Sequence, residues 1–135
     1  MSTAIAMSDI LPLTEEGIKN SIRETKPGNF RLSIEKTKDG KTEYYVHYVG
    51  RSDSDVKTEI IQRGLTDLVD QNDLPKYSHF KYTYAKNADE AYLNECNDFH
   101  HFNGLDNKIH PATPKGSNVK CPVDGCEYSS KPTRK

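Results

Sequence analysis

The stretch that decides the fold covers residues 30–50, FRLSIEKTKDGKTEYYVHYVG. Apolar and polar residues alternate from Phe30 to Lys36, which is typical of a strand with one buried face. Asp39-Gly40 then predicts a hairpin turn, because this pair tolerates the positive backbone angles that such turns need. The return strand, Thr42–Val49, is rich in β-branched and aromatic residues, and Gly50 closes it. We therefore expect an antiparallel β-hairpin here.

Helices and one further strand flank this hairpin. A capped, acidic start predicts a short helix over residues 14–25, and apolar spacing predicts a second over residues 54–71. Residues 77–84 alternate again as a third strand, and a capping box opens a helix over residues 87–102. Residues after Gly104 are loop-like. The order predicts an α+β fold with a small, mainly antiparallel three-stranded sheet flanked by helices.

Length and composition limit the class of protein. The 135 residues fit one domain, and with 33% hydrophobic residues its core must be thin. No run approaches the roughly 20 apolar residues of a membrane span, and the chain starts without the basic segment of a signal peptide. Three cysteines without an export signal indicate a reducing compartment. We expect a cytoplasmic protein with no membrane contact.

The charge of the chain limits its binding to nucleic acids. A net charge of −1 excludes a globally basic nucleic-acid coat, so DNA contact must come from a local patch. Residues 115–135 carry five basic and two acidic side chains, a net charge of +3. This basic tail either touches phosphate or is a solvated terminus.

Five landmarks follow one another along the chain. Pro27-Gly28-Asn29-Phe30 leads into the first strand, Tyr48-Val49-Gly50 ends the second, and Arg63 lies in the next helix. Glu95 lies in the last predicted helix, and Asn107 follows twelve residues later. This order resembles the GIY-YIG nuclease superfamily, whose signature is Gly-Ile-Tyr on one strand and Tyr-Ile-Gly on its neighbour.

The resemblance covers about residues 26–112. It leaves residues 1–25 as an N-terminal helical extension and residues 113–135 as an irregular tail. The chain is also similar to a bacterial and archaeal subgroup with an Asn-Lys-x-His-Pro motif and a Cys-Pro pair, here Asn107–Pro111 and Cys121-Pro122.

The resemblance implies metal-dependent hydrolysis of phosphodiester bonds in DNA. Carried over by residue, Glu95 holds Mg²⁺ or Mn²⁺, Tyr48 and Arg63 flank the phosphate, and Arg51 and Asn107 join them in binding the substrate. A metal ion and a guanidinium together neutralise the charge that gathers on phosphate oxygens. The alternative is a catalytically inactive module that binds nucleic acid or protein. Non-specific DNA binding should be weak and salt-dependent in either case, and the sequence identifies no protein partner.

Phe30 departs from the family pattern. It stands where the family has its first tyrosine, and without a hydroxyl it cannot orient or deprotonate water, which favours the inactive alternative. Tyr45 or His47 could supply a base, but strand alternation places both on the face opposite Tyr48.

Two of the proposed site residues also have simpler interpretations. Arg63 lies four residues from both Glu59 and Asp67, a spacing that predicts an exposed ladder of ion pairs. Glu95 lies on the inward stripe of its helix, where burial requires a partner. That partner is either an arginine at the edge of the core or a metal ion, and in a cleft the carboxylate could instead act as a general acid or base.

The cysteines predict a second metal site. Cys96 and His100 lie four residues apart on one helix and so face the same way, while two further cysteines bracket a turn as in a zinc knuckle. Together they predict a structural Cys₃His zinc site that fixes the tail, made of Cys96, His100, Cys121 and Cys126. His101 or His110 could replace His100. Otherwise Cys96 and His100 are core residues.

Overall fold

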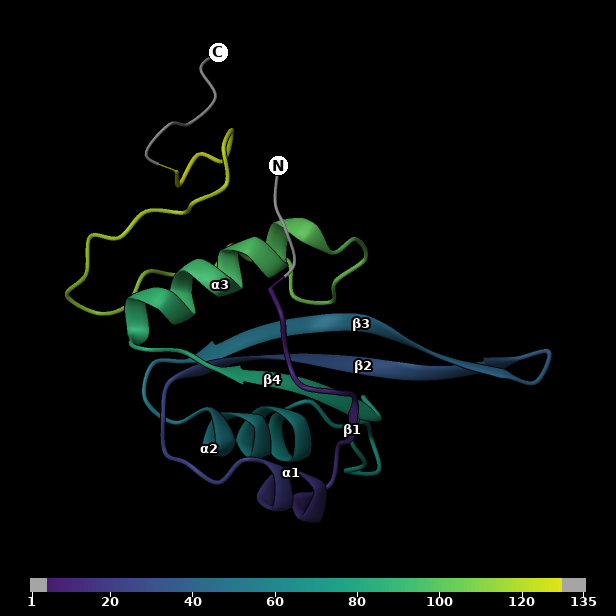
Figure 1. The fold of residues 1–135 in the computed structure, drawn as a ribbon. Coiled ribbons are helices and arrows are strands. Elements are labelled where there is room, and N and C mark those ends of the chain that lie inside the picture. The colour runs from purple at the N-terminus through teal and green to yellow at the C-terminus, as the bar shows by residue number, and fades with distance from the viewer. Residues whose placement is uncertain (1–4, 130–135) are drawn as a thin grey trace.

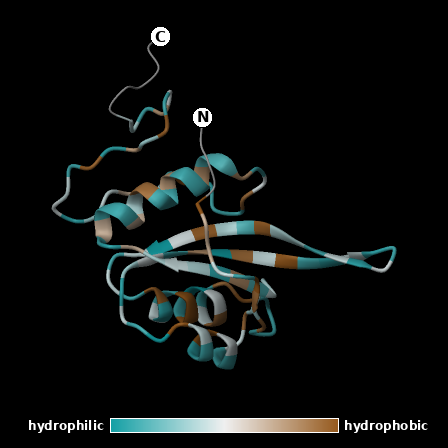
Figure 2. Ribbon diagram, in the orientation of Figure 1, coloured by the Kyte–Doolittle hydropathy of each residue, from teal (hydrophilic) through white to brown (hydrophobic). Residues whose placement is uncertain are grey.

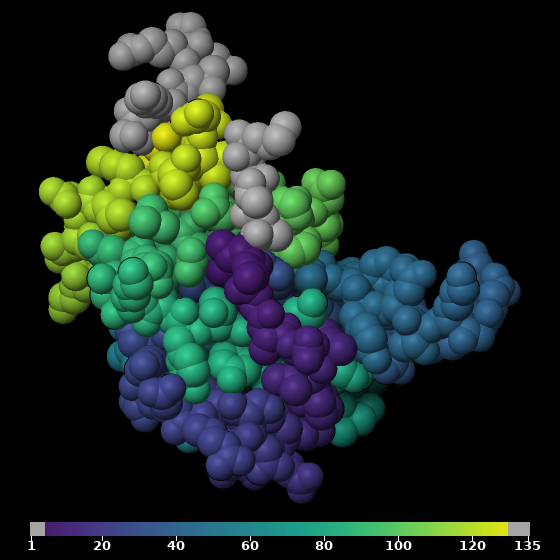
Figure 3. Space-filling model, in the orientation of Figure 1, coloured from purple at the N-terminus to yellow at the C-terminus, as the bar shows by residue number. Residues whose placement is uncertain are grey.

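The predicted hairpin forms the two longest strands of the computed structural model, which describes residues 5–129. β2 (Gly28–Lys38) and β3 (Lys41–Ser52) pair antiparallel around a turn at Asp39-Gly40, whose φ angles are 52° and 77°. The outer half of this hairpin projects from the body of the molecule as an arm (Figure 3). The β-hairpin prediction is confirmed, and each strand is longer than the sequence pattern indicated.

The sheet contains four strands. β4 (His79–Tyr84) pairs with β2, and β1 (Leu11–Pro12) pairs with β4, so the order is β1-β4-β2-β3 and every pair is antiparallel. The α+β class is confirmed, whereas three strands was one too few. β1 was missed because a two-residue strand that contains a proline has no alternation to detect.

Helices cover both faces of the sheet (Figure 1). α1 (Glu15–Ser21) and α2 (Val56–Ile60) lie against one face, and α3 (Ala88–His101) lies against the other. The main core lies under α1 and α2, where the strands are coloured as hydrophobic (Figure 2). Its buried members include residues from the segment that we separated as an extension, and they are Leu13, Ile18, Ile22, Phe30, Leu32, Val56, Ile60, Tyr77 and Phe80. Residues 11–22 are therefore part of the main domain.

The interface between α3 and the sheet is more polar. Arg31 on β2 donates two hydrogen bonds of 2.8 Å to the buried carboxylate of Asp98 on α3. Asn29 donates to the carbonyl oxygen of Ala91 at 2.8 Å. Paired polar groups thus hold this layer where apolar residues are scarce, which fits the low hydrophobic content.

The helix predicted over residues 54–71 divides in two. α2 is followed by a π-helix, η1 (Ile61–Asp67), in which the Leu68 amide donates to the carbonyl oxygen of Arg63, five residues back, at 2.8 Å. Gly64 lets this wider turn approach the core, because a Cβ there would lie 2.9 Å from the Leu13 side chain. Single π turns are frequent at functional sites.

β3 carries a bulge at His47. Tyr48 pairs with Leu32 on one side of the bulge, and Tyr45 pairs with Ile34 on the other. Residues two apart in β2 share a face, and paired residues do too. Tyr45 therefore lies on the same face as Tyr48, and our expectation of opposite faces was wrong because the extra residue resets the alternation.

The tail after α3 has little regular structure. Residues 113–129 pack through Cys121 and Val123 on Tyr92 and Cys96 of α3, which form a second, smaller core. Lys131, Arg134 and Lys135 of the predicted basic tail lie outside the described residues. Within residues 5–129, none of the helices has the length and apolar character needed to span a bilayer.

Candidate functional site

A pocket of about 420 Å³ opens where β3 ends at the edge of the sheet. Four of the predicted site residues line it: Tyr48 and Arg51 from β3, Arg63 from η1 and Glu95 from α3. Tyr48 comes from the sheet face under α2 and Glu95 from the helix on the opposite face, so the two layers meet around the edge strand (Figure 1). We call this site the edge pocket.

Phe30 forms the back of the edge pocket. Its ring is 1% exposed and lies across β3 at Gly50, where a Cβ would overlap the ring. The Tyr48 ring stacks on it with centroids 6.4 Å apart. Gly50 is therefore the residue that lets the Phe30 ring reach the pocket, although that ring brings no hydroxyl.

Arg51 is held by three acceptors. Its Nη1 donates to Glu95 Oε1 at 2.6 Å, its Nε to Asp53 Oδ1 at 2.7 Å and its Nη2 to the carbonyl oxygen of Ala112 at 2.6 Å. The guanidinium also lies 5.3 Å from the centre of the Tyr92 ring. Glu95 thus has the arginine partner that we predicted as the simpler interpretation of its inward position.

Burial raises the pKa of Glu95, and the neighbouring Arg51 opposes that rise without cancelling it. The site therefore favours the charged form of Glu95 less than water does. A divalent cation would favour the charged form. Mg²⁺ usually keeps several waters and uses only one or two carboxylates together with substrate phosphate, so a single glutamate in an open pocket fits it.

Arg63 lies on the rim of the edge pocket. Its Nε donates to Glu59 at 3.0 Å and its Nη1 to Asp67 at 3.3 Å, which confirms the predicted ladder. The Arg63 side chain is 46% exposed, and ion pairs of this kind contribute little stability, so it can turn to another anion at small cost.

Tyr48 enters the edge pocket as a neutral phenol. Burial raises its pKa, and the positive charge of Arg63 opposes that shift. Its hydroxyl is therefore suited to donate a hydrogen bond near neutral pH.

Asn107 lies outside the edge pocket, contrary to the role that the resemblance implied. Its side chain donates to the carbonyl oxygen of Val49 at 2.8 Å and accepts from the Val49 amide at 3.3 Å. The neighbouring Asp106 amide donates to the carbonyl oxygen of His47 at 2.6 Å. Asn107 thus takes the place of a neighbouring strand along the exposed edge of β3.

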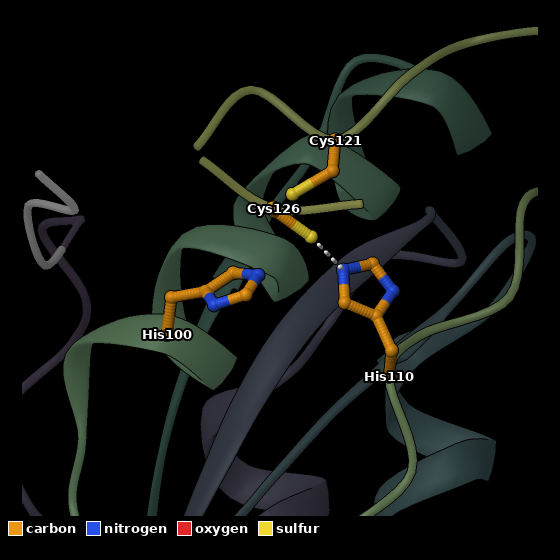
Figure 4. Close-up of side chains that lie close together, drawn as sticks. All are labelled: His100, His110, Cys121 and Cys126. Carbon is orange, nitrogen blue, oxygen red and sulfur yellow. Dashed lines mark hydrogen bonds between the residues drawn. The ribbon is translucent and has the colours of Figure 1, made fainter. Parts of the chain in front are cut away.

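A second site lies between the end of α3 and the tail. Four ligand atoms lie within 4.8 Å of one another and point toward a common centre (Figure 4), and they belong to His100, His110, Cys121 and Cys126. We call this group the Cys/His cluster. It can hold a metal ion, as the sequence predicted, with His110 in place of Cys96.

Cys96, which we predicted as a zinc ligand, is not among the four residues whose ligand atoms gather. It shares a helix face with His100 but lies one turn deeper, fully buried among Tyr92, Cys121 and Val123. Burial raises the pKa of its thiol, as it does that of Cys121. His101 is exposed and also lies outside the cluster.

The imidazoles of the Cys/His cluster are arranged as metal ligands are. His110 Nδ1 lies 2.9 Å from the carbonyl oxygen of Pro111, which can only accept, so Nδ1 carries the proton and Nε2 presents its lone pair to Cys126, 3.3 Å away. In metal sites the second ring nitrogen of histidine typically makes such a bond. Within the described part of the chain, His100 Nε2 is the buried side-chain nitrogen or oxygen without a hydrogen-bond partner.

Comparison of the chain with protein-family models, curated proteins and solved structures finds no match. Its function is therefore argued from the two sites. Sequence reasoning missed Asp53 and Ala112 as partners of Arg51. A backbone carbonyl such as that of Ala112 has no sequence signature, whereas Asp53 lay two residues from Arg51 and was overlooked.

Proposed function

We propose that this protein hydrolyses phosphodiester bonds of DNA in the edge pocket, with Mg²⁺ or Mn²⁺ held by Glu95. The observation that carries this proposal is the meeting of Tyr48, Arg51, Arg63 and Glu95, from three different elements, in one pocket. The resemblance of the sequence to GIY-YIG nucleases supports the same activity.

The charge of the pocket supports a need for the metal ion. Two arginines and three carboxylates line it, which gives a net charge of −1 from Arg51, Arg63, Asp53, Glu59 and Glu95. One divalent cation changes this to +1. A phosphate is therefore attracted only when the ion is bound.

Each side chain then has a distinct part. Arg63 leaves its exposed carboxylate partners and donates to a phosphate oxygen, and the Tyr48 hydroxyl donates to the phosphate or to the attacking water. Arg51 holds the Glu95 carboxylate in position. When bound, the divalent ion supplies charge neutralisation and lowers the pKa of a bound water.

The test is nicking of supercoiled plasmid in Mn²⁺. Glu95→Gln should lower the rate by about 10²–10³-fold, the usual effect of removing one transition-state stabiliser. Its matched control is Glu16→Gln, an exposed glutamate on α1, which should nick at the wild-type rate. Arg63→Ala should lower the rate, whereas Arg23→Ala, an exposed arginine elsewhere, should not. Equal nicking by wild type and Glu95→Gln contradicts the proposal.

Phe30 favours the second candidate function, a nucleic-acid-binding module without catalysis. A hydroxyl on this ring, which lines the pocket, would provide the second tyrosine hydroxyl of the family pattern. If the wild type binds labelled DNA in Ca²⁺ but never nicks it in Mn²⁺, and Phe30→Tyr gains activity, the second candidate replaces the first.

We further propose that the Cys/His cluster holds a structural zinc ion. Two thiolates and two imidazoles form the tetrahedral set typical of zinc, and four protein ligands leave no open position for catalysis. Elemental analysis should find about one zinc per chain. Cys121→Ser should lose it, whereas Cys96→Ser should keep it. Loss of zinc in Cys96→Ser alone would restore our original Cys₃His set.

A further inference from the structure

His110 connects the Cys/His cluster to the edge pocket. Pro111 and Ala112, which follow it directly, both line that pocket. The carbonyl oxygen of Ala112 accepts the third hydrogen bond of Arg51 at 2.6 Å. Only one residue therefore separates an imidazole of the cluster from the backbone group that holds Arg51.

This connection is short and stiff. Pro111 is buried, its ring fixes φ, and it restricts the conformation of His110 before it. The His110 ring is stacked on Tyr128 with centroids 4.2 Å apart. A restraint on the imidazole is therefore passed to the Ala112 carbonyl with little loss.

Residues 108–112 make few other hydrogen bonds. Ile109 is 87% exposed, and Lys108 is exposed too. The hydrogen bonds described for residues 108–112 are those within His110-Pro111, between Cys126 and His110, and from Arg51 to Ala112. The His110 ring also contacts Phe99 and Tyr128, so the cluster is one of the restraints at the His110 end, and Arg51 is bonded at the other end.

We infer that metal binding at the Cys/His cluster positions the edge pocket, and that His110 is the positioning residue. The bound ion fixes His110, His110 fixes the Ala112 carbonyl, and that carbonyl orients Arg51 and with it the Glu95 carboxylate. The inference rests on the proposed function only for the role of this coupling in catalysis. The coupling between metal binding and the orientation of Arg51 can be measured without DNA.

Coupling of this kind is reciprocal. If zinc orders Glu95 for a divalent ion, then Mn²⁺ in the edge pocket raises zinc affinity by the same factor. Couplings between sites typically change affinity by about 5–150-fold. We expect an effect in this range for the Mn²⁺ affinity of the zinc-loaded protein against the zinc-free protein.

The experiment follows the Nη2–H protons of Arg51, which donate to the Ala112 carbonyl oxygen, by NMR in the full chain with no DNA or Mn²⁺ present. Removal of zinc should speed their exchange with solvent by about tenfold or more, within the range of typical couplings. The matched control is the Nη2–H of Arg31, which donates to Asp98 at 2.8 Å and makes no described contact with the cluster. Its exchange should not change, which shows that the sheet and α3 remain folded.

Variants separate a positioning effect on Arg51 from a general loss of zinc or of folding. Pro111→Gly keeps all four ligands, so it should retain zinc while Arg51 exchange becomes faster. His110→Cys should retain zinc and keep more Arg51 protection than His110→Ala, and His101→Ala should match the wild type.

Unchanged Arg51 exchange after zinc removal, or in zinc-loaded Pro111→Gly, overturns the inference. Absence of bound zinc in the wild type also overturns it. A failure of the plasmid assay with these NMR results intact overturns the proposed nuclease activity alone.

Discussion

The edge pocket and the Cys/His cluster lie at the two ends of one short segment. They differ in whether their buried polar side chains have hydrogen-bond partners. In the pocket, Arg51 has three acceptors and Glu95 has Arg51. In the cluster, His100 Nε2 is buried without a hydrogen-bond partner. Unpaired buried polar atoms are costly. The buried polar groups of the pocket are therefore paired within the protein, whereas the cluster keeps an unpaired ligand atom that a metal ion could bind.

The largest expected effect comes from removing that ion. Chelation of zinc should unfold residues 113–129, because Val119 and Val123 are the main apolar side chains that these residues bring to the small core beside the cysteines. Structural zinc contributes about 10–16 kcal/mol of apparent binding energy in zinc-finger peptides. Hydrogen exchange should show lost protection in the tail and retained protection in β2 and β4. A tail that stays protected in excess chelator would show that the cluster, like the edge pocket, stays folded without a metal ion.

The second effect separates the two arginines of the edge pocket. Arg51→Ala leaves the buried Glu95 carboxylate without its partner and should lower the free energy of unfolding by about 3–5 kcal/mol. Arg63→Ala breaks only exposed pairs and should cost less than about 1 kcal/mol. Urea denaturation measures both. Equal losses would mean that Arg63 is as much a structural residue as Arg51 and is not free to bind a substrate.

The third effect is on the back of the edge pocket. Gly50→Ala places a methyl group against the Phe30 ring and should lower stability by about 1–3 kcal/mol, the usual cost of overpacking. Phe30→Leu in the same chain should recover part of that loss, because the two residues are in contact. Purely additive losses in the double variant would show that the ring and Gly50 are not coupled.

The smallest effect concerns the segment that begins at Asp106. Burial and a hydrogen bond of 2.5 Å to Asp106 raise the pKa of Tyr77. A raised pKa in the folded state stabilises it fully below the unfolded value of about 10, and this contribution is lost as pH rises further. Tyr77→Phe should therefore show a smaller fall in unfolding free energy between pH 9 and pH 11, measured in urea. An identical fall would exclude Tyr77 as a contributor.

Local patterns predicted the main elements well. Alternation identified β2 and β4, and β-branched and aromatic residues after a hairpin turn identified β3. The capping box at the start of α3 is confirmed by the 2.8 Å bond from the Glu90 amide to the Asn87 side chain. These features depend on residues close together in the chain. β1, the bulge at His47 and the π turn at Arg63 depend on tertiary packing, so periodicity could not reveal them.

The candidate sites were predicted in part for the same reason. Helical spacing placed Cys96 and His100 on one face of α3 but could not tell that Cys96 packs in the small core with the tail while His100 joins the ligand atoms. His110 comes from a loop whose path depends on Asn107 pairing with β3. The sequence indicated it only as a substitute for His100, and it replaces Cys96 instead.

The bulge at His47 has a practical consequence for protein engineering. It divides β3 into two stretches whose alternation is set separately, one in the projecting arm and one from Tyr48 to Ser52. Lengthening or shortening the arm by matched residue pairs leaves the second stretch unchanged. The hairpin tip is therefore the place to insert an epitope or a fluorescent label while every side chain of the edge pocket keeps its orientation.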